Sequence, residues 1–317
     1  MEDNQNIRTN SLKAWFLAAR PKTLSGAAVP VMIGIVFALK DTGWNDFQLL
    51  PATLCLLFAF IMQIDSNFIN DYFDCLHGND DAETRLGPKR ACSEGWITLK
   101  AMRIGLIITT TIGCIIGLPL IYFGGLEMIV VGILCVLFAF LYTTKLSYLG
   151  LGDLLVLVFF GIVPVCITYY VIMPEPLQMI TPEVFFASIA CGLIIDTLLI
   201  VNNYRDREND KRDGKMTLVV RIGEKNTELL YLILGIAGVT IICSILIAEA
   251  IDSQNVIPHL LVGILYAVYI DLHIKTWKKM KEINHGKQLN EVLGENARNM
   301  FFFGIITVIC ILKIWLY

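Results

Sequence analysis

The chain has 317 residues, of which 56% are hydrophobic and 17% charged, with a formal net charge of −3. Water-soluble domains are about 45–50% apolar, and the mean hydropathy here is +0.66. We therefore expect a membrane protein, and the weak net charge gives no reason to expect a nucleic acid partner. The nine cysteines form no Cys-x-x-Cys pair, which argues against a zinc site or a disulfide framework.

Long uncharged blocks alternate with short charged segments along the chain. Each block has about the 17–25 residues that a helix needs to cross a bilayer. The pattern predicts an all-α fold, a polytopic membrane bundle of nine transmembrane helices forming one domain over residues 1–317. The predicted spans are 24–39, 49–69, 104–123, 126–143, 154–173, 183–201, 228–248, 256–274 and 299–317.

Connections between the spans predict the arrangement of the bundle. Gly124-Gly125 separates the third and fourth spans, so we expect those two helices to be tightly antiparallel. The longest polar connections, at about 70–103 and 202–227, are expected to form cap loops on one side of the membrane. All of the 25 basic residues except Lys40 and Lys313 fall on that same side. Because positive loops stay in the cytoplasm, the N-terminus is predicted inside and the C-terminus outside.

A stripe of oxygen-bearing side chains follows the second span. If the helix continues, Asn67, Asn70, Asp71 and Asp74 share one face, because they are spaced i, i+3, i+4 and i+7. Gly78 is a candidate helix stop, and Asp80 follows it.

The sixth span ends in a second stripe of the same kind. Asn202, Asp206 and Asp210 are four residues apart, and Asn203 lies seven residues before Asp210. A single acid at such a place is usually a solvated helix end, but two clusters on one side favour a metal site. Hard divalent ions take oxygen ligands, and Mg²⁺ is commonly shared between carboxylates and substrate phosphates. The predicted metal ligands are Asp71, Asp74, Asp80, Asp206 and Asp210, of which Asp71, Asp74, Asp206 and Asp210 are also the predicted catalytic residues.

Basic residues accompany both clusters and are candidate phosphate ligands. For each one, the alternative is a residue of the positive cytoplasmic face that lies against lipid headgroups. A diphosphate bound at the end of an apolar bundle implies a lipid tail, so a polyprenyl diphosphate is the expected substrate. Loss of its diphosphate would leave an allylic cation that must be kept from water. The basic candidates are Arg85, Lys89, Arg90, Arg205, Lys211 and Lys215.

Four stretches resemble one known family. They are "AARPKTL" (18–24), "NDYFDCLHGNDDAETRLGPKR" (70–90), "LYTTKLSYLGLGD" (141–153) and "NNYRDRENDKRDGKMTLVVRIG" (202–223). Together they resemble the UbiA superfamily of intramembrane aromatic prenyltransferases, and within it the 1,4-dihydroxy-2-naphthoate polyprenyltransferases. The family often has a third Asp where this chain has Gly78, and either Asp80 or Asp81 is expected to replace it.

The resemblance implies a Mg²⁺-dependent enzyme of menaquinone biosynthesis in a bacterial inner membrane. It implies transfer of a polyprenyl group to the ring of 1,4-dihydroxy-2-naphthoate, with loss of CO₂, to give demethylmenaquinol. Tyr142 and Lys145 are expected to contact substrate, as are the amides of both stripes (Asn67, Asn70, Asn202 and Asn203).

The sequence leaves two alternatives to this function open. Another aromatic acceptor, such as 4-hydroxybenzoate, fits the same motifs. A secondary transporter would place its acids near the midplane and show inverted repeats, whereas most acids here lie at one end of the spans. Asp196, deep in the sixth span, is expected either to face a cavity or to make a local structural hydrogen bond.

Overall fold

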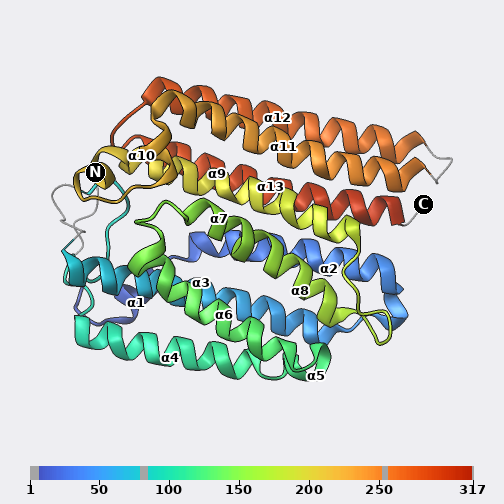
Figure 1. Cartoon of the computed structure of the whole chain (residues 1–317), viewed down its shortest axis with the longest axis horizontal. Helices are drawn as coiled ribbons and strands as arrows, with labels where there is room; N and C mark the ends of the chain where they lie inside the picture. The colour runs from blue at the N-terminus through green and yellow to red at the C-terminus, as the bar shows by residue number, and fades with distance from the viewer. Residues whose placement is uncertain (1–6, 79–84, 252–255, 316–317) are drawn as a thin grey trace.

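The helices lie side by side along the long axis of the molecule (Figure 1). The structure is a computed structural model and describes residues 7–78, 85–251 and 256–315. Within these residues there is no strand, and nine helical segments are long and apolar enough to cross a membrane. The all-α, nine-span prediction is confirmed.

The chain order begins with a short helix and two long ones: α1 (Leu12–Ala19), α2 (Leu24–Asp46) and α3 (Leu49–His77). The middle of the chain forms α4 (Leu99–Gly117), α5 (Leu120–Gly124), α6 (Glu127–Leu141), α7 (Gly152–Val156) and α8 (Val163–Ile172), with π-helical turns η2 (Tyr142–Leu146) and η3 (Leu157–Ile162). The remainder comprises α9 (Pro182–Arg212), α10 (Leu218–Ile222), α11 (Glu224–Ile251), α12 (Val256–Ile283) and α13 (Leu289–Trp315).

Several helices run well beyond the apolar blocks that predicted them. Hydropathy marks only the apolar part of a helix, while the backbone hydrogen bonds continue into polar sequence. The second predicted block ends at residue 69, but α3 continues to His77 and stops at Gly78, whose φ is 72°. The sixth ends at 201, but α9 continues to Arg212. Both polar stripes are therefore helical, and each expected cap region also ends in helix, at the start of α4 for the first and in α10 and α11 for the second.

The expected tight pairing of the third and fourth spans is wrong. The turn does form at Gly124-Gly125, where Gly125 has a φ of 78°, but α4 packs mainly against α3. Asp65 of α3 explains this preference, because its carboxylate accepts hydrogen bonds from Thr109 and Thr110 of α4. In an apolar environment such groups must be satisfied within the protein, so they favour this pairing.

Candidate functional site

The two acidic motifs meet at one end of the bundle, which we call the acidic end. Asn290 of α13 joins them. Its amide donates to the backbone oxygen of Leu86 over 2.8 Å, and its Oδ1 accepts from Arg205 Nη1 over 2.8 Å. Gly87 also lies against Arg205, since a Cβ there would come within 2.8 Å of Nη2. Three segments far apart in the sequence therefore converge.

Three of the predicted metal-binding acids each contact a basic side chain. Arg90 Nη2 lies 3.2 Å from Asp74 Oδ2, and Lys215 Nζ lies 3.4 Å from Asp210 Oδ1. The buried guanidinium of Arg205 donates to both carboxylate oxygens of Asp206 and to Asn202 Oδ1. The predicted acidic and basic residues are thus brought together in pairs.

Asp71 has different surroundings from the other acids. It is fully buried, and its two carboxylate oxygens accept hydrogen bonds from the backbone N–H groups of Ala91 (3.1 Å) and Cys92 (3.4 Å). Charge-assisted hydrogen bonds to backbone amides are strong. In this structure Asp71 therefore holds the segment that follows the first motif.

The other basic residues of the first motif divide between the site and the surface. Arg85 lies within the electrostatic reach of both Asp74 and Asp206, and burial together with the neighbouring Arg90 lowers its pKa to about 10. It therefore stays charged at neutral pH. Lys89 is half exposed and its ammonium lies 3.4 Å from Glu94.

A large cavity, which we call the chamber, opens beside the acidic end. Its volume is about 1160 Å³, and most of its wall is apolar, with side chains from α2, α3, α6, α8, η3, α9 and α13. Polar groups gather in one part of this wall, where Asn67 also donates to the Ala19 carbonyl and Thr23 Oγ1, and Asn70 accepts from Thr143. The polar groups of interest here are Asn67, Asn70, Tyr142, Asn202 and Asn290.

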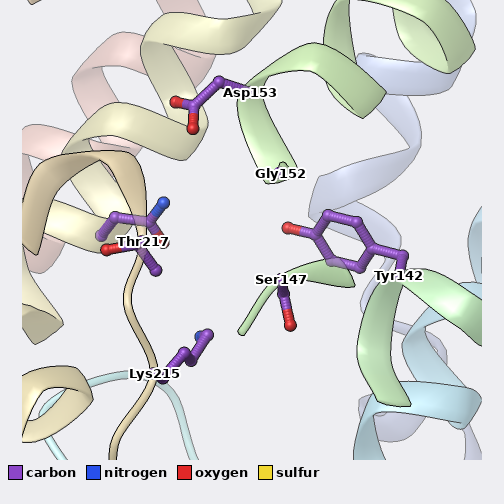
Figure 2. A pocket seen from close by; sticks show the side chains of 7 residues that line it. Tyr142, Ser147, Gly152, Asp153, Lys215 and Thr217 are labelled. Carbon is purple, nitrogen blue, oxygen red and sulfur yellow. The ribbon is translucent and has the colours of Figure 1, made fainter. Parts of the chain in front are cut away.

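A small polar pocket lies behind Tyr142, with room for about one water molecule (Figure 2). It is lined by Tyr142, Ser147, Gly152, Asp153, Asn203, Lys215 and Thr217. The Tyr142 hydroxyl points into this pocket, although the same residue also lines the chamber. Tyr142 therefore separates the two spaces, and Asn202 and Asn203, adjacent on α9, face different ones.

The Asp153 carboxylate lines this small pocket, and those of Asp196 and Asp210 lie within electrostatic range of Tyr142. Neither oxygen of Asp153 has a hydrogen-bond partner among the described residues, and the same holds for Asp196 Oδ1 and Asp210 Oδ2. The Asp153 and Asp196 carboxylates lie within electrostatic range of each other. For Asp196, the structure thus shows a buried acid close to a cavity.

One predicted site residue is not brought to this region, and another cannot be located because it lies outside the described residues. Lys145 is exposed and lines neither the chamber nor the small pocket. Asp80, with its alternative Asp81, lies outside the described residues.

The sequence reasoning missed Asn290 and Asp153. Asn290 precedes the predicted last span, and no spacing relates it to the acidic motifs, whose contacting residues Leu86 and Arg205 lie 204 and 85 residues earlier. Asp153 stands at the start of an apolar block, and an acid in that position was a signal that could have singled it out.

The donor set fits a Mg²⁺ ion shared with a substrate. No three His, Cys, Asp or Glu side chains converge as a metal cluster among the residues the structure describes. Mg²⁺ needs only one or two carboxylates when phosphate oxygens and waters complete its coordination. Asp74 and Asp206 would supply one carboxylate from each motif, and the unpartnered Oδ2 of Asp210 is a further buried oxygen available to a cation.

The amino-acid sequence is similar to those of known proteins. The sequence profile of the UbiA prenyltransferase family matches residues 27–287. The 1,4-dihydroxy-2-naphthoate octaprenyltransferase of Escherichia coli (strain K12) is 36% identical, over 71% of this chain and 73% of the relative. The enzyme of the same description from Haemophilus influenzae is 33% identical, over 80% and 83%.

Solved structures show the same fold. A UbiA homolog from Aeropyrum pernix K1 matches with a TM-score of 0.65 at 15% identity, over 89% of this chain and 97% of the other. A UbiA homolog from Archaeoglobus fulgidus bound to DMAPP and Mg²⁺ matches with a TM-score of 0.57 at 14% identity, over 93% and 98%.

Proposed function

Because the chain belongs to the UbiA prenyltransferase family, we propose that it transfers a polyprenyl group to 1,4-dihydroxy-2-naphthoate. The group comes from polyprenyl diphosphate, CO₂ is lost from the ring, and demethylmenaquinol is formed for menaquinone biosynthesis. The relatives described above, which carry the naphthoate activity in their names, support this acceptor. The observation that carries the proposal is the meeting of two acidic motifs beside an apolar chamber.

The acidic end is proposed to bind the diphosphate. Mg²⁺ would be held by Asn70 and Asp74 of the first motif and by Asn202, Asp206 and Asp210 of the second, with Asp80 as a further candidate, and it would neutralise the departing diphosphate. Asp71 was predicted among these ligands, but its amide contacts favour a structural role.

The basic residues have a second role in this proposal. Arg90, Arg205 and Lys215 neutralise the acids in the structure. When the acids bind a metal ion in place of these basic partners, the released cations are available to bind phosphate oxygens. Arg85, Lys89 and Lys145 are proposed phosphate contacts that need a local side-chain movement, and Lys145 needs the largest one.

The chamber is proposed to hold the prenyl tail and to exclude water from the allylic cation. Its volume of about 1160 Å³ is slightly above the ~300–1,000 Å³ of common ligand pockets, and the ring of Tyr142 forms part of its wall. An aromatic face attracts a cation, so the ring of Tyr142 is suited to stabilise the allylic cation. Residues 1–317 act as one domain under this proposal, in the inner membrane of a bacterium.

Turnover by the purified protein tests the proposal. With Mg²⁺, a polyprenyl diphosphate and dihydroxynaphthoate, we expect prenylated product and released diphosphate, and EDTA should abolish both until Mg²⁺ is restored. Asp74→Asn should lower kcat by about 10²–10³-fold, because metal stabilisation of the leaving group contributes several kcal/mol. Asp271→Asn, at an exposed ion pair on α12, is the matched control and should leave kcat unchanged.

Two outcomes would redirect the proposal. A transporter would release no diphosphate under these conditions. Faster turnover with 4-hydroxybenzoate, in a panel of acceptors tested with one donor, would keep the family reaction but replace the acceptor.

A further inference from the structure

The wall of the chamber carries an unbalanced positive charge. Among its lining residues in the described part of the chain, the only fully charged side chains are Lys22 and Arg298, and none is an Asp or Glu. No described residue forms an ion pair with either of them, whereas Arg90, Arg205 and Lys215 at the acidic end are each paired.

Helix packing places the two cations at about the same depth. α2 and α13 run in the same direction (Figure 1) and pack against each other. Gly304 of α13 touches Val29 of α2, since a Cβ at Gly304 would lie 2.9 Å from the Val29 side chain. Arg298 lies six residues before Gly304, and Lys22 lies seven residues before Val29, so both are about two turns back from this contact.

Lys22 and Arg298 lie at a different depth from the acidic end, where the diphosphate is proposed to bind. Asn290, which contacts Arg205, lies on the same chamber-facing side of α13 as Arg298. Their separation of eight positions corresponds to about 12 Å along the helix. Lys22 is next to Thr23, which accepts from Asn67, and Asn67 lies about 10 Å along α3 from Asp74. A ligand that extends from the acids into the chamber reaches these cations with its other end.

We propose that Arg298, assisted by Lys22, binds the carboxylate of the aromatic acceptor and thereby selects acceptors that carry one. Two like charges without a counter-charge beside an apolar cavity favour an anionic ligand. The guanidinium of Arg298 can bind a carboxylate through two parallel hydrogen bonds. This inference rests on the proposed function, but it concerns only recognition of the acceptor, because the diphosphate has its own site.

Binding measured without the prenyl donor tests the inference independently of turnover. The probes are 1,4-dihydroxy-2-naphthoate and 1,4-dihydroxynaphthalene, which lacks the carboxylate. The wild-type protein should bind the naphthoate more tightly, and Arg298→Gln should weaken its binding by about 10–100-fold, the loss expected for hydrogen bonds to a charged group. Binding of the diol should not change. Arg298→Lys should restore part of the preference, and Lys22→Gln should have a smaller effect.

Kinetics and a matched control complete the test. Arg298→Gln should raise KM for the naphthoate and leave KM for the prenyl diphosphate unchanged. Arg103→Gln removes an exposed arginine of α4 that does not line the chamber and should change neither constant.

Three results would overturn the inference. They are equal affinity of the wild-type protein for the two probes, a naphthoate affinity that Arg298→Gln leaves intact, and a rise in KM for the diphosphate alone. The last would assign Arg298 to the donor. Failure of the proposed function looks different, because the protein would then turn over no naphthoate, whatever the residue at position 298.

Discussion

Asp71 and Asp74 are three residues apart on one helix, yet their carboxylates make different contacts. Asp71 is enclosed by the backbone amides of Ala91 and Cys92, while Asp74 remains partly exposed and contacts Arg90. Spacing on α3 placed both on one stripe, but their chemistry depends on the segment that packs over them. The residue with two backbone amide donors is suited to structure, and the partly exposed residue with a basic side chain as its partner is suited to bind a ligand.

Asp71→Asn should therefore destabilise the protein rather than remove a metal ligand. The asparagine amide would face a backbone N–H, and losing one charge-assisted hydrogen bond in a buried place costs about 2–3 kcal/mol. We expect a lower thermal unfolding temperature in detergent, and a smaller decrease for Asp74→Asn. Mn²⁺ binding in the presence of prenyl diphosphate should survive in Asp71→Asn and weaken in Asp74→Asn. The opposite assignment would be correct if Asp71→Asn kept its stability and lost the ion.

At the level of elements, α9 is the helix on which the second motif depends. It begins at Pro182 after the Thr181 cap and continues without interruption to Arg212. One rigid helix therefore carries Asn202, Asn203, Asp206 and Asp210 at fixed spacing. Its position is set by close packing against η3, where a Cβ on Gly161 would lie 2.6 Å from the Gly192 Cα and 2.7 Å from the Ser188 carbonyl oxygen. Small residues commonly allow such contacts between membrane helices.

Gly161→Ala should push α9 away from η3. Because both nearest atoms belong to the backbone, the contact cannot be relieved by a side-chain rotation. We expect a loss of about 1–3 kcal/mol in stability, as in other overpacked cores, and a lower kcat because the second motif moves relative to the first. Gly263→Ala in α12, where a Cβ has no neighbour within 4 Å, should be neutral in thermal unfolding and turnover. Equal behaviour of the two variants would show that this contact does not set the position of α9.

At the scale of the whole molecule, the basic connections and the acidic end lie at the same end of the helical bundle. The N-terminus lies at the end of the bundle where α1 and α10 are found, and the C-terminus lies at the other end (Figure 1). If all nine apolar helices of the described residues cross the membrane, the start of α2 and the end of α13 lie on opposite sides of it. The acidic end is on the side of the N-terminus, where the positively charged connections also gather.

Topology mapping should place the N-terminus and the acidic end in the cytoplasm. A reporter active only in the cytoplasm should work when fused to the N-terminus, and one active only outside should work at the C-terminus. Single cysteines introduced at Lys211 and at Leu177, in a background without reactive cysteines, report the two faces with a membrane-impermeant thiol reagent. In intact cells, labelling at position 177 and none at 211 is expected, and the reverse pattern would reverse the orientation.

The amino-acid sequence by itself determined the membrane environment, the helix content and the two acidic motifs. These follow from local properties: a span needs about twenty apolar residues, and side chains three and four apart share a helix face. The type of reaction also followed, through the resemblance carried by four stretches of the chain.

Only the tertiary structure decided which of these residues work together. Asn290 joins the motifs, Tyr142 separates two cavities, and Lys22 and Arg298 reach one wall from opposite ends of the chain. No periodicity in the sequence relates such residues, because their proximity depends on which helices pack together and at what height. The same reason separates Asp71 from Asp74, since the backbone amides that surround Asp71 come from a segment twenty residues away.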